Sequence, residues 1–203
     1  MSQHEWDGRP LAGACLGLIV LGAPPAEAPR SLHLVAACST ESRCVVAPDR
    51  LGDFLRVHHD AVLACHDVGR VFWSIADHLR LANDAEAIAV LWKYPKTNRL
   101  ADVGLLDQLV ALAELGVESP YRSLAKLTAT YDAADTGVEH ETGSPDDGAA
   151  GTPWATLDPV VVNDAVRDAG AVLSLYEVLI ARAPSVTEDR VARGRAAAGS
   201  LTP

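Results

Sequence analysis

The sequence predicts an α/β domain in which a mixed central sheet of about five strands is flanked by helices. Two observations lead to this fold class. The first third of the chain holds four short apolar runs separated by Pro-rich or polar turns, and the fourth run leads directly into a helical pattern. The remainder is dominated by apolar residues at three- and four-residue spacing, which is typical of helices that pack on a sheet.

The strands can be placed from their apolar runs and the turns between them. Three strands in succession, expected at residues 15–21, 31–37 and 43–47, indicate a meander, and a fourth is expected at 61–65. A fifth strand is expected at either 87–91 or 99–102. Both places stay open because a short apolar run does not distinguish a strand from a buried helix.

Helices are predicted where apolar positions repeat at helical spacing after a capping residue. Asp49 is a plausible N-cap for the first helix and Asn163 for the last. The Leu-rich segment that ends at Gly116 carries the broadest apolar stripe. The expected helices cover residues 49–59, 72–79, 105–116, 123–131 and 163–182.

The length and composition indicate one domain. A chain of 203 residues that is 49% hydrophobic and 22% charged can bury one substantial core. We assign residues 1–183 to this domain. Residues 132–159 are rich in Gly, Asp, Thr and Pro and are expected to form a mobile acidic loop, and residues 184–203 are expected to be a frayed polar tail.

Charge and composition argue against several classes of function. A formal net charge of −10 disfavours broad phosphate binding, and an aromatic content of 5% indicates no stacking surface for single-stranded nucleic acid. Lys93, Lys96 and Arg99 lie close together beside Trp92 and form either a local basic patch or an ordinary solvated loop. The four cysteines include no CxxC pair, so neither a zinc ribbon nor a redox motif is indicated.

The apolar run from Leu11 to Gly22 is similar to the hydrophobic region of a signal peptide. The residues before it carry two acids and one Arg, which is the wrong charge for that interpretation, and the run is too short to span a bilayer. A buried strand between Pro10 and Pro24 fits better. We therefore predict a cytoplasmic protein without membrane contact, and a secreted protein remains a distant alternative.

Three segments of the sequence carry motifs that we interpret as one set. They are LACHDVGRVFW from Leu63 to Trp73, RLADVGLLDQL from Arg99 to Leu109, and NDAVRDAGAVLSLY from Asn163 to Tyr176. In this order they resemble the proofreading-type 3′–5′ exonuclease domains of family A DNA polymerases. The resemblance spans residues 16–179 and implies a ribonuclease H-like fold.

The first segment resembles the HNxxFD motif of that family, in which a strand leads into a helix. His66 matches the His, Asp67 the Asn, Arg70 the Phe and Val71 the metal-binding Asp. A different interpretation of His66 and Asp67 is an ordinary helix N-terminus, because Asp caps a helix as well as Asn does.

The other two segments supply the remaining acids. Asp102 matches an acid of the second motif that is mainly structural in the family. In the third motif, YxxxD, Asp168 matches the catalytic acid and Asp164 stands where the Tyr would be. Like charges at i and i+4 repel each other unless a metal or a neighbouring Arg, such as Arg70, lies between them. Placement near a helix N-terminus would also favour both carboxylates.

The resemblance implies a site that has lost most of its metal ligands. Such nucleases hold two divalent cations about 4 Å apart with carboxylates. The family's first motif, Asp-x-Glu, should fall within residues 16–25, where the sequence has no acid. Of the four metal-binding positions only Asp168 is kept, because Val71 replaces another. Loss of catalysis is the expected consequence.

Three hypotheses follow. The first is a degenerate, inactive exonuclease-like domain without a cofactor, which binds a nucleic acid end, such as single-stranded DNA, or a replication or repair partner, such as a separate DNA polymerase. The second is an active 3′–5′ exonuclease with Mg²⁺ or Mn²⁺ in an unusual ligand set. The third is a non-catalytic protein-interaction module. The oligomeric state stays open.

The second hypothesis, an active enzyme, assigns catalytic and metal-binding residues. Asp102 and Asp168 would be catalytic, and Asp164 and Asp168 would be metal ligands, with Asp67 and Asp102 completing the unusual set. The candidates for nucleic-acid contact are His66, Asp67, Arg70, Lys93 and Lys96.

Overall fold

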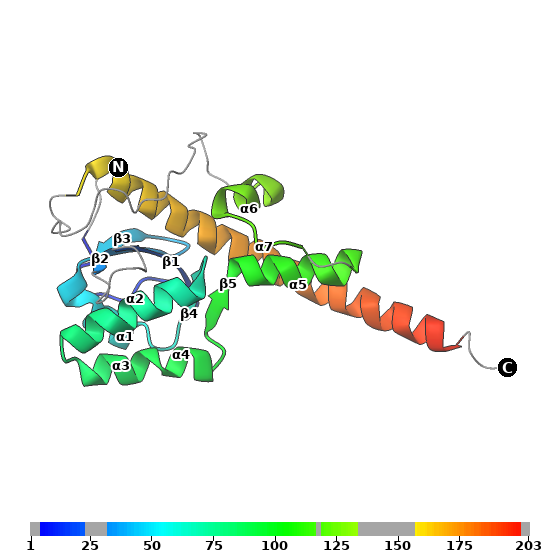
Figure 1. Ribbon diagram of the computed structural model, residues 1–203, viewed down its shortest axis with the longest axis horizontal. Coiled ribbons are helices and arrows are strands. Elements are labelled where there is room, and N and C mark those ends of the chain that lie inside the picture. Colours follow the sequence, from blue (N-terminus) through cyan, green and yellow to red (C-terminus); the bar gives the residue numbers. More distant parts are fainter. Residues whose placement is uncertain (1–4, 23–31, 117–118, 134–156, 200–203) are drawn as a thin grey trace.

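A computed structural model of the chain describes residues 5–22, 32–116, 119–133 and 157–199. Five strands form one mixed sheet in the order β3-β2-β1-β4-β5 (Figure 1). The strands are β1 (Cys15–Gly22), β2 (Leu32–Cys38), β3 (Arg43–Val46), β4 (Val62–Cys65) and β5 (Leu100–Asp102). The predicted mixed sheet of five strands is thus confirmed, with its fifth strand at the second of the two expected places.

The strand directions place several segment ends at one edge of the sheet. β1, β2 and β3 are antiparallel neighbours, as the meander predicts, whereas β4 and β5 run parallel to β1. Cys65 pairs with Leu18 on one side and Asp102 on the other. The carboxyl ends of β4 and β5 therefore lie side by side, which is where open α/β sheets usually place a site.

Helices cover both faces of the sheet (Figure 1). One layer holds α1, α2, α3 and α4, and the opposite face is covered by the long α7, against which α5 and α6 pack. The helices are η1 (Pro48–Arg50), α1 (Leu51–Val57), α2 (Val68–Leu81), α3 (Ala85–Leu91), α4 (Lys93–Lys96), α5 (Val103–Leu115), α6 (Leu124–Tyr131) and α7 (Pro159–Gly199). No helix among the described residues is long and apolar enough to cross a membrane.

The structure differs from the sequence expectations at three places, and a fourth expectation is not covered by the described residues. Residues 87–91 belong to α3, because the Asp84 side chain accepts from the Ala87 amide and starts a helix there. Asp49 lies inside η1 and makes no capping hydrogen bond. α7 begins at Pro159 and continues to Gly199, through the segment where we expected a frayed tail. Most of the expected acidic loop, residues 134–156, lies outside the described residues.

Gly17 in the central strand β1 lies directly against the backbone of α7. A Cβ atom on Gly17 would clash with the carbonyl oxygen of Ala169 and would lie 2.8 Å from the amide nitrogen of Leu173. The backbone of α7 therefore rests directly on β1. Only glycine permits this contact, since the atoms it meets belong to a helix backbone that cannot turn aside.

We expect Gly17→Ala to lower the free energy of unfolding by about 1–3 kcal/mol or more, because α7 must move away from the sheet. Gly69→Ala is a matched control, since a Cβ atom there would meet only Asp67 at 3.7 Å. Urea unfolding of the two variants measures the difference. Equal stability of the two variants would contradict the proposed backbone contact.

A buried histidine holds the N-terminal segment against the helical layer. Nδ1 of His58 donates to the carbonyl of Phe54 at 2.8 Å, and Nε2 accepts from the amide of Leu11 at 2.8 Å. The hydroxyl of Tyr94 donates to the His58 carbonyl at 2.9 Å. Burial lowers the pKa of His58, so the neutral ring is the form that fits the fold.

This arrangement makes stability depend on pH in a defined direction. Because the pKa of His58 is lower in the folded state, the unfolded chain takes up a proton first as the pH falls below about 6.5. The free energy of unfolding should therefore decrease between about pH 7 and pH 5. Replacing His58 by Gln should flatten this decrease, whereas replacing the exposed His59 by Gln should not; urea titrations at several pH values check both.

Candidate functional site

Side chains with polar chemistry gather where β4 and β5 end and where α2 and α5 begin. His66 and Asp67 directly follow β4, and Asp102 is the last residue of β5. The segment 119–122 crosses this edge and contacts all three residues. We refer to these residues together with Tyr121 and Arg122 as the strand-end cluster.

Asp102 serves as a helix cap and a cross-link within the strand-end cluster. Its Oδ1 accepts from the amides of Gly104 at 2.9 Å and Leu105 at 3.1 Å, which caps α5. Its Oδ2 accepts from the amide of Val68 at 2.9 Å, and Oδ1 also accepts from the Tyr121 hydroxyl at 3.0 Å. A carboxylate has about four acceptor positions, so protein donors already engage this one extensively.

Asp67 and His66 fix the turn between β4 and α2. Asp67 has a φ of 59° and caps α2 through a hydrogen bond from the amide of Arg70 at 3.1 Å. Its own amide donates to the Tyr121 hydroxyl at 2.8 Å. Nε2 of His66 lies 2.8 Å from the carbonyl of Arg122. Both residues therefore shape the backbone here, as the capping interpretation of the sequence expects.

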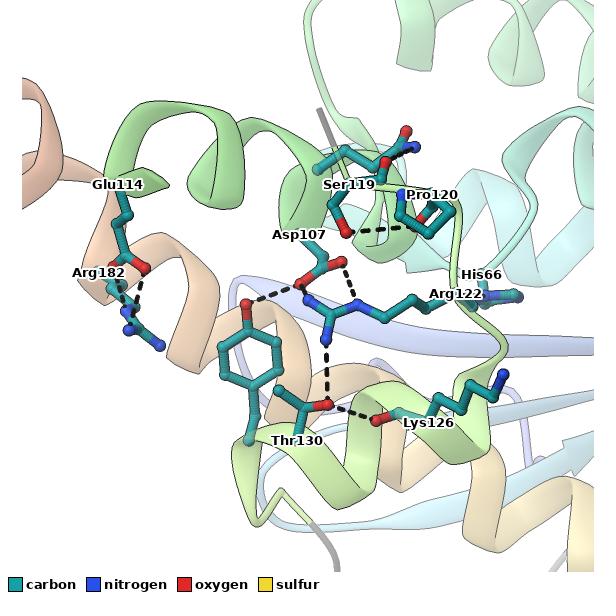
Figure 2. Close-up of polar contacts among 11 residues, drawn as sticks. His66, Asp107, Glu114, Ser119, Pro120, Arg122, Lys126, Thr130 and Arg182 are labelled. Atoms are coloured by element: carbon teal, nitrogen blue, oxygen red, sulfur yellow. Dashed lines mark hydrogen bonds and ion pairs between the residues drawn. The ribbon is translucent and has the colours of Figure 1, made fainter. Parts of the chain in front are cut away.

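A buried ion pair anchors the segment 119–122 beneath this edge (Figure 2). Asp107 of α5 is fully buried, and the Arg122 guanidinium binds both of its carboxylate oxygens. The Tyr131 hydroxyl donates to Asp107 at 2.7 Å, and Arg122 also donates to Thr130 at 3.1 Å (Figure 2). Burial and the nearby carboxylate raise the pKa of Tyr131 to about 12.

The sequence analysis missed the Asp107 network, although one signal for it was present. Asp107 lies at i+4 from Val103 and at i−3 from Val110, so it occupies the buried stripe of α5. An acid within such a stripe requires a buried partner, because an unpaired buried charge is very costly. The partner itself, Arg122, cannot be identified before the tertiary structure is known.

Asp164 and Asp168 lie on the first half of α7, a different element from those that carry the strand-end cluster. Asp164 pairs with Arg167 at 2.9 Å, so Arg167 is a positive group beside the two carboxylates. Burial, and then the negative charge of Asp164, raise the pKa of Asp168, and Arg167 counteracts part of this rise. Asp164 and Asp168 are therefore neighbours one helical turn apart on α7, at i and i+4.

The remaining positions of the metal-binding motifs are filled by core residues. Val71 is buried in the apolar cluster between α2 and the sheet, with Leu18 and Val20 of β1. Ile19 and Leu21, on the other face of β1, pack against α7. All of these side chains are apolar, so β1 supplies no carboxylate to either face.

Lys93 and Lys96 lie on α4, in the helical layer opposite α7 (Figure 1). Arg99, the third member of the basic stretch, pairs with Asp60. Tyr94 between the two lysines is buried, whereas Trp92 is partly exposed. The candidate nucleic-acid residues therefore divide between two surfaces, with His66, Asp67 and Arg70 at the strand ends and the lysines on α4.

The residues that the structure describes do not assemble the carboxylate set of the two-metal nucleases that the sequence resembles. Among the described residues, no group of three or more His, Cys, Asp or Glu side chains could hold a metal ion. Asp102 and Asp67 serve as caps, and Asp164 is paired with Arg167. We therefore derive no catalytic step through a metal.

Comparison with known proteins supports the fold. No protein-family model matches the sequence, and no curated protein is significantly similar to it. Among solved structures, the chain is similar to the EXO domain of Nibbler from Aedes aegypti, with a TM-score of 0.56 and 13% sequence identity, over 88% of this chain and 85% of that one. At this identity the likeness establishes the fold, which is ribonuclease H-like, as the sequence predicts.

Substitutions in and outside the Asp107 network test how much a buried and an exposed ion pair contribute to the free energy of unfolding. We expect Arg122→Met to lower the free energy of unfolding by about 3–5 kcal/mol, because it leaves the Asp107 carboxylate buried without a cation. The more exposed pair between Glu114 and Arg182 provides the control, and Glu114→Gln should cost about 1 kcal/mol or less. Urea unfolding measures both, and a small loss for Arg122→Met would contradict the role given to this pair.

Proposed function

We propose that this chain is an exonuclease-like domain that has lost nuclease chemistry and acts as a non-catalytic binding domain. The observation that carries the proposal is the apolar character of β1 together with the burial of Val71. In the sequence family that the motifs resemble, these two places supply three of the four metal-binding acids. In this chain they supply packing for the core.

The physical consequence concerns the free energy of bringing cations into the site. Two divalent cations close together repel each other strongly, and only several ionised carboxylates can compensate for this repulsion. Asp168 remains as a single matched acid, and its raised pKa reflects the cost of ionising it where it lies. Replacing acids by apolar residues also stabilises the core by burying more apolar surface.

The alternative of an active enzyme with an unusual ligand set requires Asp67, Asp102, Asp164 and Asp168 to act together. Asp67 and Asp102 are linked through Tyr121, while Asp164 is paired with Arg167 on another element. The carboxylates of Asp67 and Asp102 already cap helices, and that of Asp164 already has a cation partner. This favours the non-catalytic domain over the active enzyme.

The proposal also covers the kind of partner that the domain binds. The polymerase-like sequence segments favour a replication or repair context, in which the domain binds a nucleic acid end or a separately made DNA polymerase in the cytoplasm. A protein-interaction module is favoured by a different observation, the large apolar side chains exposed on α5. Leu105, Leu109 and Leu115 are 52%, 61% and 71% exposed.

Incubation of the purified protein with a labelled single-stranded oligonucleotide tests the loss of catalysis. We expect no shortening with Mg²⁺ or Mn²⁺, and the same result for Asp168→Ala. Neither metal should raise the melting temperature, since a cation that binds the folded state would stabilise it. Metal-dependent shortening that Asp168→Ala abolishes would overturn the proposal.

A further inference from the structure

Two of the four tryptophans of this chain meet at its surface. Trp73 lies on α2 and Trp92 lies between α3 and α4, and their ring centroids are 6.0 Å apart at an interplanar angle of 79°. Their side chains remain 42% and 37% exposed. The buried ring of Phe72 packs edge-on against Trp92, with centroids 4.9 Å apart, and so supports the pair from below. The three rings together form a partly exposed aromatic platform.

Basic side chains border this platform. The guanidinium of Arg80 lies 5.7 Å from the centroid of the Trp73 ring. Trp92 has a helical backbone, so Lys96 at i+4 lies on the same side of the helix, whereas Lys93, the next residue, is offset from Trp92 around the helix. Neither lysine forms an ion pair within the part of the chain that the structure describes.

The stretch of chain around Trp92 is basic in sequence, whereas the whole chain is acidic, and Arg99 of this stretch is paired with Asp60. Residues 87–101 contain three basic residues and no Asp or Glu, although the chain carries a formal net charge of −10. Arg80 is paired with Asp77, which is the nearest acid along α2. An aromatic and basic surface on an acidic protein requires a ligand that is negatively charged and offers flat groups for stacking.

We propose that the surface formed by Trp73, Trp92, Arg80, Lys93 and Lys96 binds a single-stranded nucleic acid. Bases would stack on the two indoles, and the lysines with Arg80 would contact the phosphates. An acidic peptide would satisfy the charges but would offer no ring to each indole. Because this surface lies in the helical layer opposite α7, the inference goes beyond the proposed loss of catalysis and does not depend on it.

The binding can be measured by fluorescence anisotropy with a labelled oligothymidylate and the full chain in EDTA. We expect binding that weakens with salt, with a slope of about −2 in log K against log salt for three phosphate contacts. Trp92→Leu should weaken binding about tenfold or more, through loss of one stacked base. The double variant Lys93→Gln with Lys96→Gln should reduce the salt slope to about one third.

Two variants outside the surface serve as matched controls. Lys126→Gln on α6 removes one positive charge, and Leu109→Ala on α5 removes an exposed apolar side chain. Both should leave the affinity unchanged. Trp92→Phe keeps an aromatic ring and should retain most of the binding, which separates stacking from any effect of Trp92→Leu on folding.

Three results would overturn the inference. They are no binding of oligothymidylate at low salt, equal binding by all the variants, and equally tight binding of an oligoglutamate peptide, which would mean that charge alone is recognised. Because EDTA removes divalent cations, none of these results bears on nuclease activity. A failure of this inference therefore remains distinct from a failure of the proposed function.

Discussion

The backbone contact between β1 and α7 at Gly17 is the constraint on which the rest of the structure depends. β1 is the central strand, and it holds antiparallel β2 on one side and parallel β4 on the other. With α7 resting directly on this strand, Val172, Leu175 and Leu179 reach the cluster that α5 and α6 also enter. The position of the carboxyl ends of β4 and β5 relative to α7 follows from this contact.

Hydrogen bonding at those strand ends serves the fold. Asp102, Tyr121 and Asp67 link the starts of α2 and α5, and Arg122 carries the connection to the buried Asp107. Each carboxylate there accepts from protein donors, so the acids are satisfied where they lie. Other open α/β sheets bind a ligand at this edge. Here the chain's own segment 119–122 crosses the edge and contacts the strand ends.

The exposed tryptophans and the two lysines near them lie in the helical layer that α1, α2, α3 and α4 form. The charge and aromatic content of the whole sequence disfavour nucleic-acid binding, yet α2 and α3 bring Trp73 and Trp92 together beside Lys93 and Lys96. A composition averages over all surfaces, whereas recognition depends on which few side chains are neighbours. The sequence analysis therefore identified the lysines and missed Trp73, which is distant from them along the chain.

Apart from α3, α4 and the fifth strand, the sequence by itself determined the elements and their order, because apolar period, caps and turns are local properties. It also determined that β1 cannot supply a carboxylate to bind a metal, since the strand contains no Asp or Glu. Only the tertiary structure decided between 87–91 and 99–102 for the fifth strand, because both runs are apolar and only the second can pair with β4. It likewise decided that Arg122 pairs with Asp107 and that Arg167 pairs with Asp164, since charge pairing depends on distances that sequence spacing does not give.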